Sequence, residues 1–232
     1  MATQAKQPVF SHELFEFLAE LRQNNDRQWF GANKRRYEEQ LLEPALDFIE
    51  AFAPRLAKIS PYFRADPRPS GGSLFRIYRD TRFSKDKSPY KTNVGIHFRH
   101  ERAKDVHAPG YYLHIGPGEV FAGGGIWHPD TEAATRIREA IVADPQGWKR
   151  ATRQGAFAKR LGLGGDSLKR VPSWADAEHP FAEDLKRKDF FGSARLTEDD
   201  VVSPDFVDEY AGLCRAAAPL MRFLCGALDV PY

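Results

Sequence analysis

Apolar residues recur at helical spacing through the first 60 residues of the chain. The stripe begins after Ser11, a suitable N-cap, and continues in three segments, the third with Pro44 in its first turn. The stripe residues are Leu14, Phe15, Phe17, Leu18 and Leu21; then Trp29, Phe30, Tyr37 and Leu41; then Leu46, Ile49, Phe52, Leu56 and Ile59. The pattern predicts three helices before Ser60.

Between residues 73 and 127 the pattern changes to short runs rich in β-branched and aromatic residues, which favour strands. The runs cover residues 73–79, 92–99, 110–116 and 119–127. Gly-Pro-Gly at 116–118 predicts a hairpin between the last two runs. Gly123 to Gly125 indicate a bulge, or another backbone passing close by. We expect an antiparallel sheet of at least four strands here.

Helical spacing returns after Asp130, which we expect to cap a helix. Further helices are expected from Asp144 through Leu161, over 181–189, and over 204–228 with Ser203 as its cap. The run LGLGGD at 161–166 resembles a phosphate loop but lacks the Lys-Ser/Thr of a Walker motif and follows no strand, so it favours a helix end. The whole pattern predicts a single α+β domain over 1–232, with a mid-chain antiparallel sheet packed against N- and C-terminal helices.

Composition limits the class of protein. A chain of 232 residues with 42% hydrophobic and 28% charged residues is typical of a globular protein. No apolar run approaches the roughly 18 residues of a membrane span, and MATQAKQPVF has no hydrophobic signal core. We therefore expect a cytoplasmic protein without a membrane partner. Cys214 and Cys225 share one predicted helix about 16 Å apart, too far for a disulfide, so both should be buried and reduced.

Positive charge is concentrated in the segment Arg76–Lys91, which we call the basic segment. It carries six cations and two acids, +4 in a chain whose formal net charge is +2. Arginine and lysine side chains bind phosphate and carboxylate. We predict an anion-binding site with Asp80 as an orienting residue, formed by Arg76, Arg79, Arg82, Lys87, Tyr90 and Lys91. The alternative is an Arg–Asp–Lys network that only pins the loop to helix C-termini or to the acidic residues of 181–200.

The same segment carries a resemblance to a known family. Its run R-x-x-R-D-x-R-F-x-x-x-K-x-x-Y, from Arg76 to Tyr90, resembles the signature of the domain-of-unknown-function 2461 family, an uncharacterised and mostly bacterial family. Flanking motifs are also similar, at Asn24–Lys34, Pro109–Ile115 and Gly123–Trp127. The resemblance implies one domain of this length. It implies no activity, because none is established for the family.

Other residues have weaker claims to chemistry. His97, His114 and His128 lack metal-ligand spacing, so we expect no metal and no cofactor. His114, beside Tyr112 on one strand face, and Asp80 are the candidate catalytic residues. Asn24 to Phe30 favours a helix start with an aromatic anchor over a pocket wall. Core packing is favoured over base stacking for four rings of the strands, Tyr111, Tyr112, Phe121 and Trp127.

Two hypotheses about function follow. In the first, the domain binds, or also turns over, a small phosphorylated or carboxylated ligand at the basic segment. In the second, the same segment is a docking patch for nucleic acid or an acidic partner. An enclosing pocket would favour the first hypothesis and an open convex patch the second. Reaction, substrate and oligomeric state are not determined by the sequence.

Overall fold

The computed structural model describes residues 7–82, 84–102 and 108–232. Phe83 of the family signature lies outside the described residues. The elements in chain order are α1 (His12–Gln23), α2 (Arg27–Ala32), α3 (Lys34–Tyr37), η1 (Glu38–Leu42, a π-helix), α4 (Glu43–Ile59), β1 (Val94–Arg99), β2 (Gly110–Gly116), β3 (Glu119–Ile126), α5 (Thr131–Ala143), α6 (Pro145–Arg153), α7 (Gly155–Arg160), β4 (Gly162–Leu163), α8 (Ala182–Leu185), β5 (Phe190–Leu196), α9 (Glu198–Val201) and α10 (Phe206–Ala227).

The strands form one antiparallel sheet in the order β1-β2-β3-β5-β4. Strands β2 and β3 form the expected hairpin, in which Gly116 pairs with Glu119 and Gly118 adopts a φ of 76°. A positive φ favours glycine, so this turn is encoded locally. The predicted fold class, a mid-chain antiparallel sheet with helices from both ends of the chain, is confirmed.

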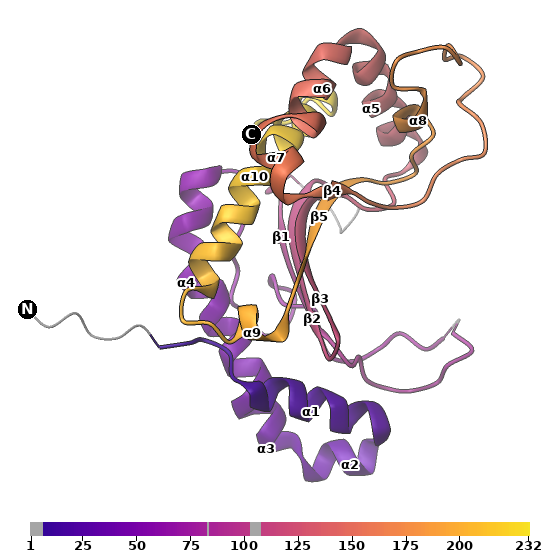
Figure 1. The fold of residues 1–232 in the computed structure, drawn as a ribbon. Coiled ribbons are helices and arrows are strands. Elements are labelled where there is room, and N and C mark those ends of the chain that lie inside the picture. The colour runs from indigo at the N-terminus through magenta and orange to yellow at the C-terminus, as the bar shows by residue number, and fades with distance from the viewer. Residues whose placement is uncertain (1–6, 83, 103–107) are drawn as a thin grey trace, which may run out of the picture.

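Helices α4 and α10 lie together on one side of the sheet (Figure 1). Phe52 of α4 packs against Phe98 of β1 and Tyr210 of α10, with ring centroids 4.7 and 4.8 Å apart. The core is therefore built where chain segments far apart in sequence meet.

Cys214 and Cys225 are both buried in α10 and free. Among the helices of the described ranges, none combines the length and the apolar character that a membrane span requires.

Side-chain capping marks the start of several helices. Asp26 accepts hydrogen bonds from two backbone N–H groups at the start of α2, and Asp130 does the same for one at the start of α5. Ser11 is the N-cap residue of α1, and Pro44 lies in the first turn of α4, as expected. Helix α10 begins at Phe206 with Asp205 as N-cap, so Ser203 as its cap was a wrong prediction.

Two strand predictions need correction. Residues 73–79 form no strand: Leu74 makes an isolated bridge to Ile96, and Tyr78 makes one to Tyr90. This second pairing stays short because Pro89 has no N–H to donate.

The helix predicted over 181–189 is only the four-residue α8, and the strand β5 that follows was missed. β5 pairs with β3 and places its backbone against Gly123 and Gly125, which explains those glycines by close approach.

Candidate functional site

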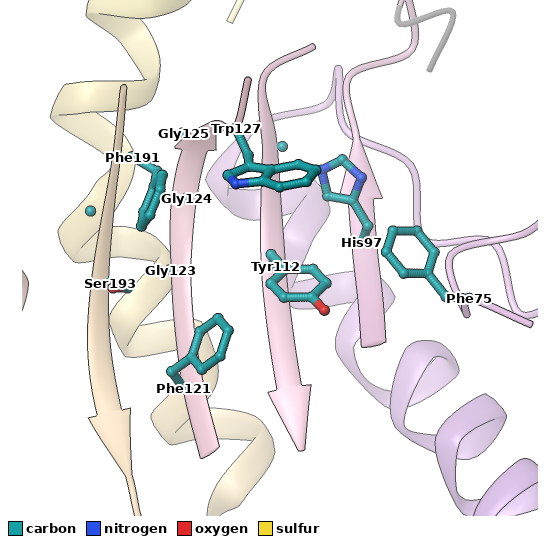
Figure 2. A pocket seen from close by; sticks show the side chains of 12 residues that line it. Phe75, His97, Tyr112, Phe121, Gly123, Gly124, Gly125, Trp127, Phe191 and Ser193 are labelled. Carbon is teal, nitrogen blue, oxygen red and sulfur yellow. The ribbon is translucent and has the colours of Figure 1, made fainter. Parts of the chain in front are cut away.

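The sheet face opposite α4 and α10 carries the candidate site. Cross-strand pairing aligns His97, Tyr112, Gly123 and Ser193 in one row across four strands. Because side chains alternate along a strand, the neighbours Tyr111 and Leu113 point into the core while Tyr112 stays partly exposed. In Figure 2 the side chains of this row and its neighbours lie in front of the strands, with the helices behind.

A cavity of about 360 Å³ lies on this face, and we call it the sheet pocket. Its walls are mainly aromatic, and its polar groups include the imidazole of His97 and the hydroxyls of Tyr112 and Ser193. Figure 2 shows the rings around it, from Phe75, Tyr112, Phe121, Trp127 and Phe191. Pockets for small molecules have volumes of about 300–1,000 Å³ and a mainly apolar and aromatic lining with a few polar groups, and this cavity has both properties.

Glycines make room for these side chains. A Cβ on Gly110 would lie 2.0 Å from Nε2 of His97, and a Cβ on Gly95 would lie 2.8 Å from the Tyr112 hydroxyl. Both separations are far below van der Waals contact. The site thus depends on glycine at these two strand positions.

The histidines of the sheet differ in environment. Burial, and secondarily the charge of Arg99, lowers the pKa of His97 to about 4, so its ring is neutral at physiological pH. His114 stacks on Phe121 with centroids 4.6 Å apart, and its Nδ1 lies 3.4 Å from the Tyr112 hydroxyl. Burial also lowers the pKa of His114, while it raises the pKa of Tyr112 to about 12. His114 is thus a neutral proton acceptor on the open face.

This pocket was not predicted from the sequence. Core packing was expected for four strand rings, but only Tyr111 is in the core; Tyr112 and Phe121 are partly exposed and Trp127 is 54% exposed. One signal was available in the chain. Gly110, Tyr112 and His114 occupy every second position of β2 and so lie on one face of the sheet. A glycine beside rings on the same face leaves space there, which indicates a hollowed face rather than a packed one.

The basic segment projects from the sheet on the side away from α4 and α10 (Figure 1). Its two ends meet beside the pocket: Lys91 Nζ donates to the Arg76 carbonyl at 2.8 Å and lies 5.4 Å from the centroid of Phe75, a pocket wall. Burial, and then the charge of Arg76, lowers the pKa of Lys91. Positive charge is therefore crowded at this end of the pocket.

Farther along the basic segment, cations and acids pair with one another. Arg79 contacts Asp86, and Arg82 binds Asp80 with Nη2–Oδ2 at 2.7 Å. The hydrogen bond from Arg82 is the main reason that the pKa of Asp80 falls to about 2, so Asp80 stays ionised and is a poor general acid. Lys87 donates to the Thr81 carbonyl. These contacts join residues of the basic segment to one another, whereas the structural alternative named helix C-termini and the acidic residues of 181–200 as partners. Arg76 and Lys91 are the cations at the pocket end of the segment.

Tyr90 anchors the basic segment. Its N–H donates to the Asn25 side-chain oxygen and its carbonyl accepts from the Asn25 amide, both at 3.0 Å. Its ring is buried and stacks on Phe30 with centroids 4.0 Å apart. The segment around Asn25 is thus a helix start with an aromatic anchor, as favoured, and it also holds the end of the basic segment.

A third histidine lies beside the pocket wall. His128 has a φ of 48°, and its ring packs against that of Trp127 with centroids 4.1 Å apart and the planes tilted by 32°. The buried carboxylate of Asp189 accepts hydrogen bonds from its backbone N–H at 2.8 Å and lies 2.9 Å from its Nδ1. Within the described ranges, no three His, Cys, Asp or Glu side chains gather as a metal site would require.

The fold and the cavity together define the chain as an α+β domain with an aromatic pocket on the open face of an antiparallel sheet. A model of the family described as "Conserved hypothetical protein (DUF2461)" matches residues 13–223. The chain belongs to this family, as the resemblance of its motifs indicated. Neither the curated proteins nor the solved structures contain a match to the chain.

Proposed function

We propose that this domain binds a small ligand that combines a planar apolar group with a phosphate or carboxylate. The planar group would lie in the sheet pocket, and the anionic group would be held at the nearer end of the basic segment by Arg76 and Lys91. The observation that carries the proposal is the position of Phe75, whose ring lines the pocket and lies 5.4 Å from Lys91 Nζ.

Electrostatics support the anionic half of the ligand. The pKa of Lys91 is lowered by burial and by Arg76, which means that its charged form is destabilised by its surroundings. A phosphate or carboxylate placed between these two cations would supply a compensating negative charge. Arg79, Arg82 and Lys87 would then add to the local positive potential, and Tyr90 would hold the segment in place.

A histidine that contacts two residues of the pocket wall, Tyr112 and Phe121, is available for turnover. His114 lies beside Tyr112 on the open face and is neutral near pH 7 because its pKa is lowered. A neutral imidazole next to a bound ligand is suited to act as a general base. If the ligand is a substrate, we propose His114 for that role.

A thermal-shift screen tests the proposal. The panel would comprise nucleoside monophosphates, sugar phosphates and dicarboxylates at constant ionic strength, so that screening is not mistaken for binding. A true ligand at 100 times its dissociation constant stabilises the protein by about 2.7 kcal/mol, which raises Tm by roughly 5–10 °C. Nucleoside monophosphates, which carry both a planar ring and a phosphate, should give larger shifts than sugar phosphates.

Two variants separate the halves of the site. Ser193→Leu fills the pocket and Arg76→Gln removes one cation, so each should reduce the Tm shift by at least half. Arg35→Gln removes an arginine whose side chain is 86% exposed on α3 and serves as the matched control. If both site variants respond to the panel as the parent does, or if no compound shifts the parent, the proposal is wrong.

A second candidate function is binding of single-stranded nucleic acid. It is favoured by the exposure of two rings, Tyr78 in the basic segment and Trp127 in the wall of the sheet pocket, each 54% accessible. Rings on a sheet face can stack bases while cations contact phosphates. Tight binding of oligonucleotides with a steep salt dependence, and no binding of mononucleotides, would favour this function over the first.

A further inference from the structure

A second cavity, of about 320 Å³, shares His97 with the lining of the sheet pocket. It is formed between the end of β1 and residues 64–73. Backbone hydrogen bonds hold these two segments together, from Arg64 N to Arg99 O at 2.9 Å and from His97 N to Ser73 O at 2.8 Å. We call it the arginine cavity because three arginines line it: Arg64, Arg68 and Arg99.

Charge in the arginine cavity is not fully compensated. Arg64 pairs with Glu101 at 2.6 Å, and Arg68 binds Asp66 through both Nε and Nη2. Arg99, partly buried, makes no ion pair or hydrogen bond through its guanidinium with any residue in the described ranges. The charge of Arg99 still acts nearby. The pKa of Asp66 is lowered mainly by its hydrogen bond from Arg68 and that of His97 mainly by burial, and Arg99 adds a smaller lowering to each. One guanidinium of the cavity lining is therefore without a partner among the residues that the structure describes.

His97, two residues before Arg99 on the same strand face, has an unused hydrogen-bonding atom. His97 is 7% exposed, and its Nδ1 atom is buried with no hydrogen-bond partner among the described residues. Nε2 is directed towards Gly110 and the sheet pocket. Buried polar atoms in proteins are nearly always satisfied, so an unsatisfied one beside a cavity indicates a missing partner.

We propose that the arginine cavity binds a small oxyanion, a phosphate or a carboxylate, that pairs with Arg99 and accepts a hydrogen bond from Nδ1 of His97. An oxyanion meets both unsatisfied groups at once, since it supplies negative charge to the guanidinium and a lone pair to an Nδ1–H tautomer. This inference goes beyond the proposed function. It uses no residue of the basic segment and shares only His97 with the sheet pocket.

The test is a titration of the ¹⁵N-histidine-labelled protein with inorganic phosphate, and separately with malonate, at constant ionic strength set with sodium chloride. Imidazole ¹⁵N resonances report the hydrogen bonding of each ring nitrogen, and His97→Gln assigns the signal. We expect a saturable change in the His97 signal with at least one anion, and the anion that acts at lower concentration identifies the ligand as phosphate or carboxylate.

Variants locate the bound anion. Arg99→Gln should weaken binding at least tenfold, while Arg79→Gln in the basic segment and the exposed Arg35→Gln should leave it unchanged. If neither anion changes the His97 signal saturably, or if Arg79→Gln removes the response and Arg99→Gln does not, the proposal is overturned. Should Arg99→Gln fail to fold, the His97 signal of the parent protein decides the question. Because loss of nucleotide binding in Arg76→Gln is a separate result, the two proposals can fail independently.

Discussion

At the scale of single residues, His97 lines both cavities, and its surroundings lower its pKa to about 4. Figure 2 shows its ring between Trp127 and Phe75, where water has little access. Such a ring resists protonation, because the imidazolium would be desolvated and would lie near the charge of Arg99. The ionisation of His97 is therefore linked to stability.

We predict that the protein loses stability as the pH falls from 7.5 to 5. The pKa of His97 is about 4 in the folded protein against 6.5 for the free side chain, so between these values the unfolded chain binds the proton and the folded protein does not. The expected loss in the free energy of unfolding is about 2 kcal/mol at pH 5. Urea unfolding at the two pH values measures it.

His97→Gln should flatten this pH dependence. His114→Gln is the matched control; the pKa of His114 is also lowered, but by a smaller margin, so this variant should retain most of the dependence. Asp80 does not interfere, because its pKa of about 2 confines its effect to more acid solutions. An unchanged pH dependence in His97→Gln would contradict the buried, neutral state of this ring.

At the scale of elements, the connection between α1 and α2 holds the end of the basic segment. Asn25 uses both atoms of its amide to pair with the backbone of Tyr90, much as a neighbouring strand would. Phe30 of α2 then covers the Tyr90 ring. Two motifs 65 residues apart in the chain therefore form one unit.

Asn25→Ala should destabilise the protein by about 1–3 kcal/mol, because it leaves two partly buried backbone groups of Tyr90 without partners. It should also speed hydrogen exchange across the basic segment, as measured by mass spectrometry of its peptides. Asn24→Ala is the control, since Asn24 makes one exposed hydrogen bond to Glu20 and none to the segment. Equal exchange in the two variants would mean that Asn25 does not anchor the segment.

At the scale of the whole molecule, α10 links the sheet to the helices from the start of the chain, and both cysteines are inside it. Burial raises the pKa of the Cys214 thiol and raises that of Cys225 to about 12. Neither thiolate forms in the folded protein at neutral pH. Access to either sulfur requires α10 to leave the sheet.

We predict that both thiols react with a thiol reagent only on global unfolding, at least about a thousandfold more slowly than in the unfolded chain. Mass spectrometry of protein unfolded without reductant, in the presence of a blocking reagent, should show two blocked cysteines. Fast labelling of the native protein, or a 214–225 disulfide, would contradict the position of α10.

The pattern of residues determined the elements that depend on near neighbours. Helical spacing, the caps at Asp26 and Asp130 and the hairpin at Gly116–Gly118 each rest on residues within a few positions of one another. The family motifs and the concentration of charge at Arg76–Lys91 are equally properties of the chain alone. These features could be predicted because short-range hydrogen bonds and side-chain periodicity act within one turn or one strand.

Only the tertiary structure decided how distant segments meet. β5 was missed because its place beside β3 depends on pairs such as Gly125 with Phe191, and its short apolar run is ambiguous by itself. Strand alternation places Tyr111 and Tyr112 on opposite faces of the sheet. Which of these faces stays open depends on the side on which α4 and α10 pack. The sheet pocket follows from that choice, and the arginine cavity follows from the pairing of residues 64–73 with the end of β1. Periodicity tells which residues share a face, and only long-range packing tells which face is covered.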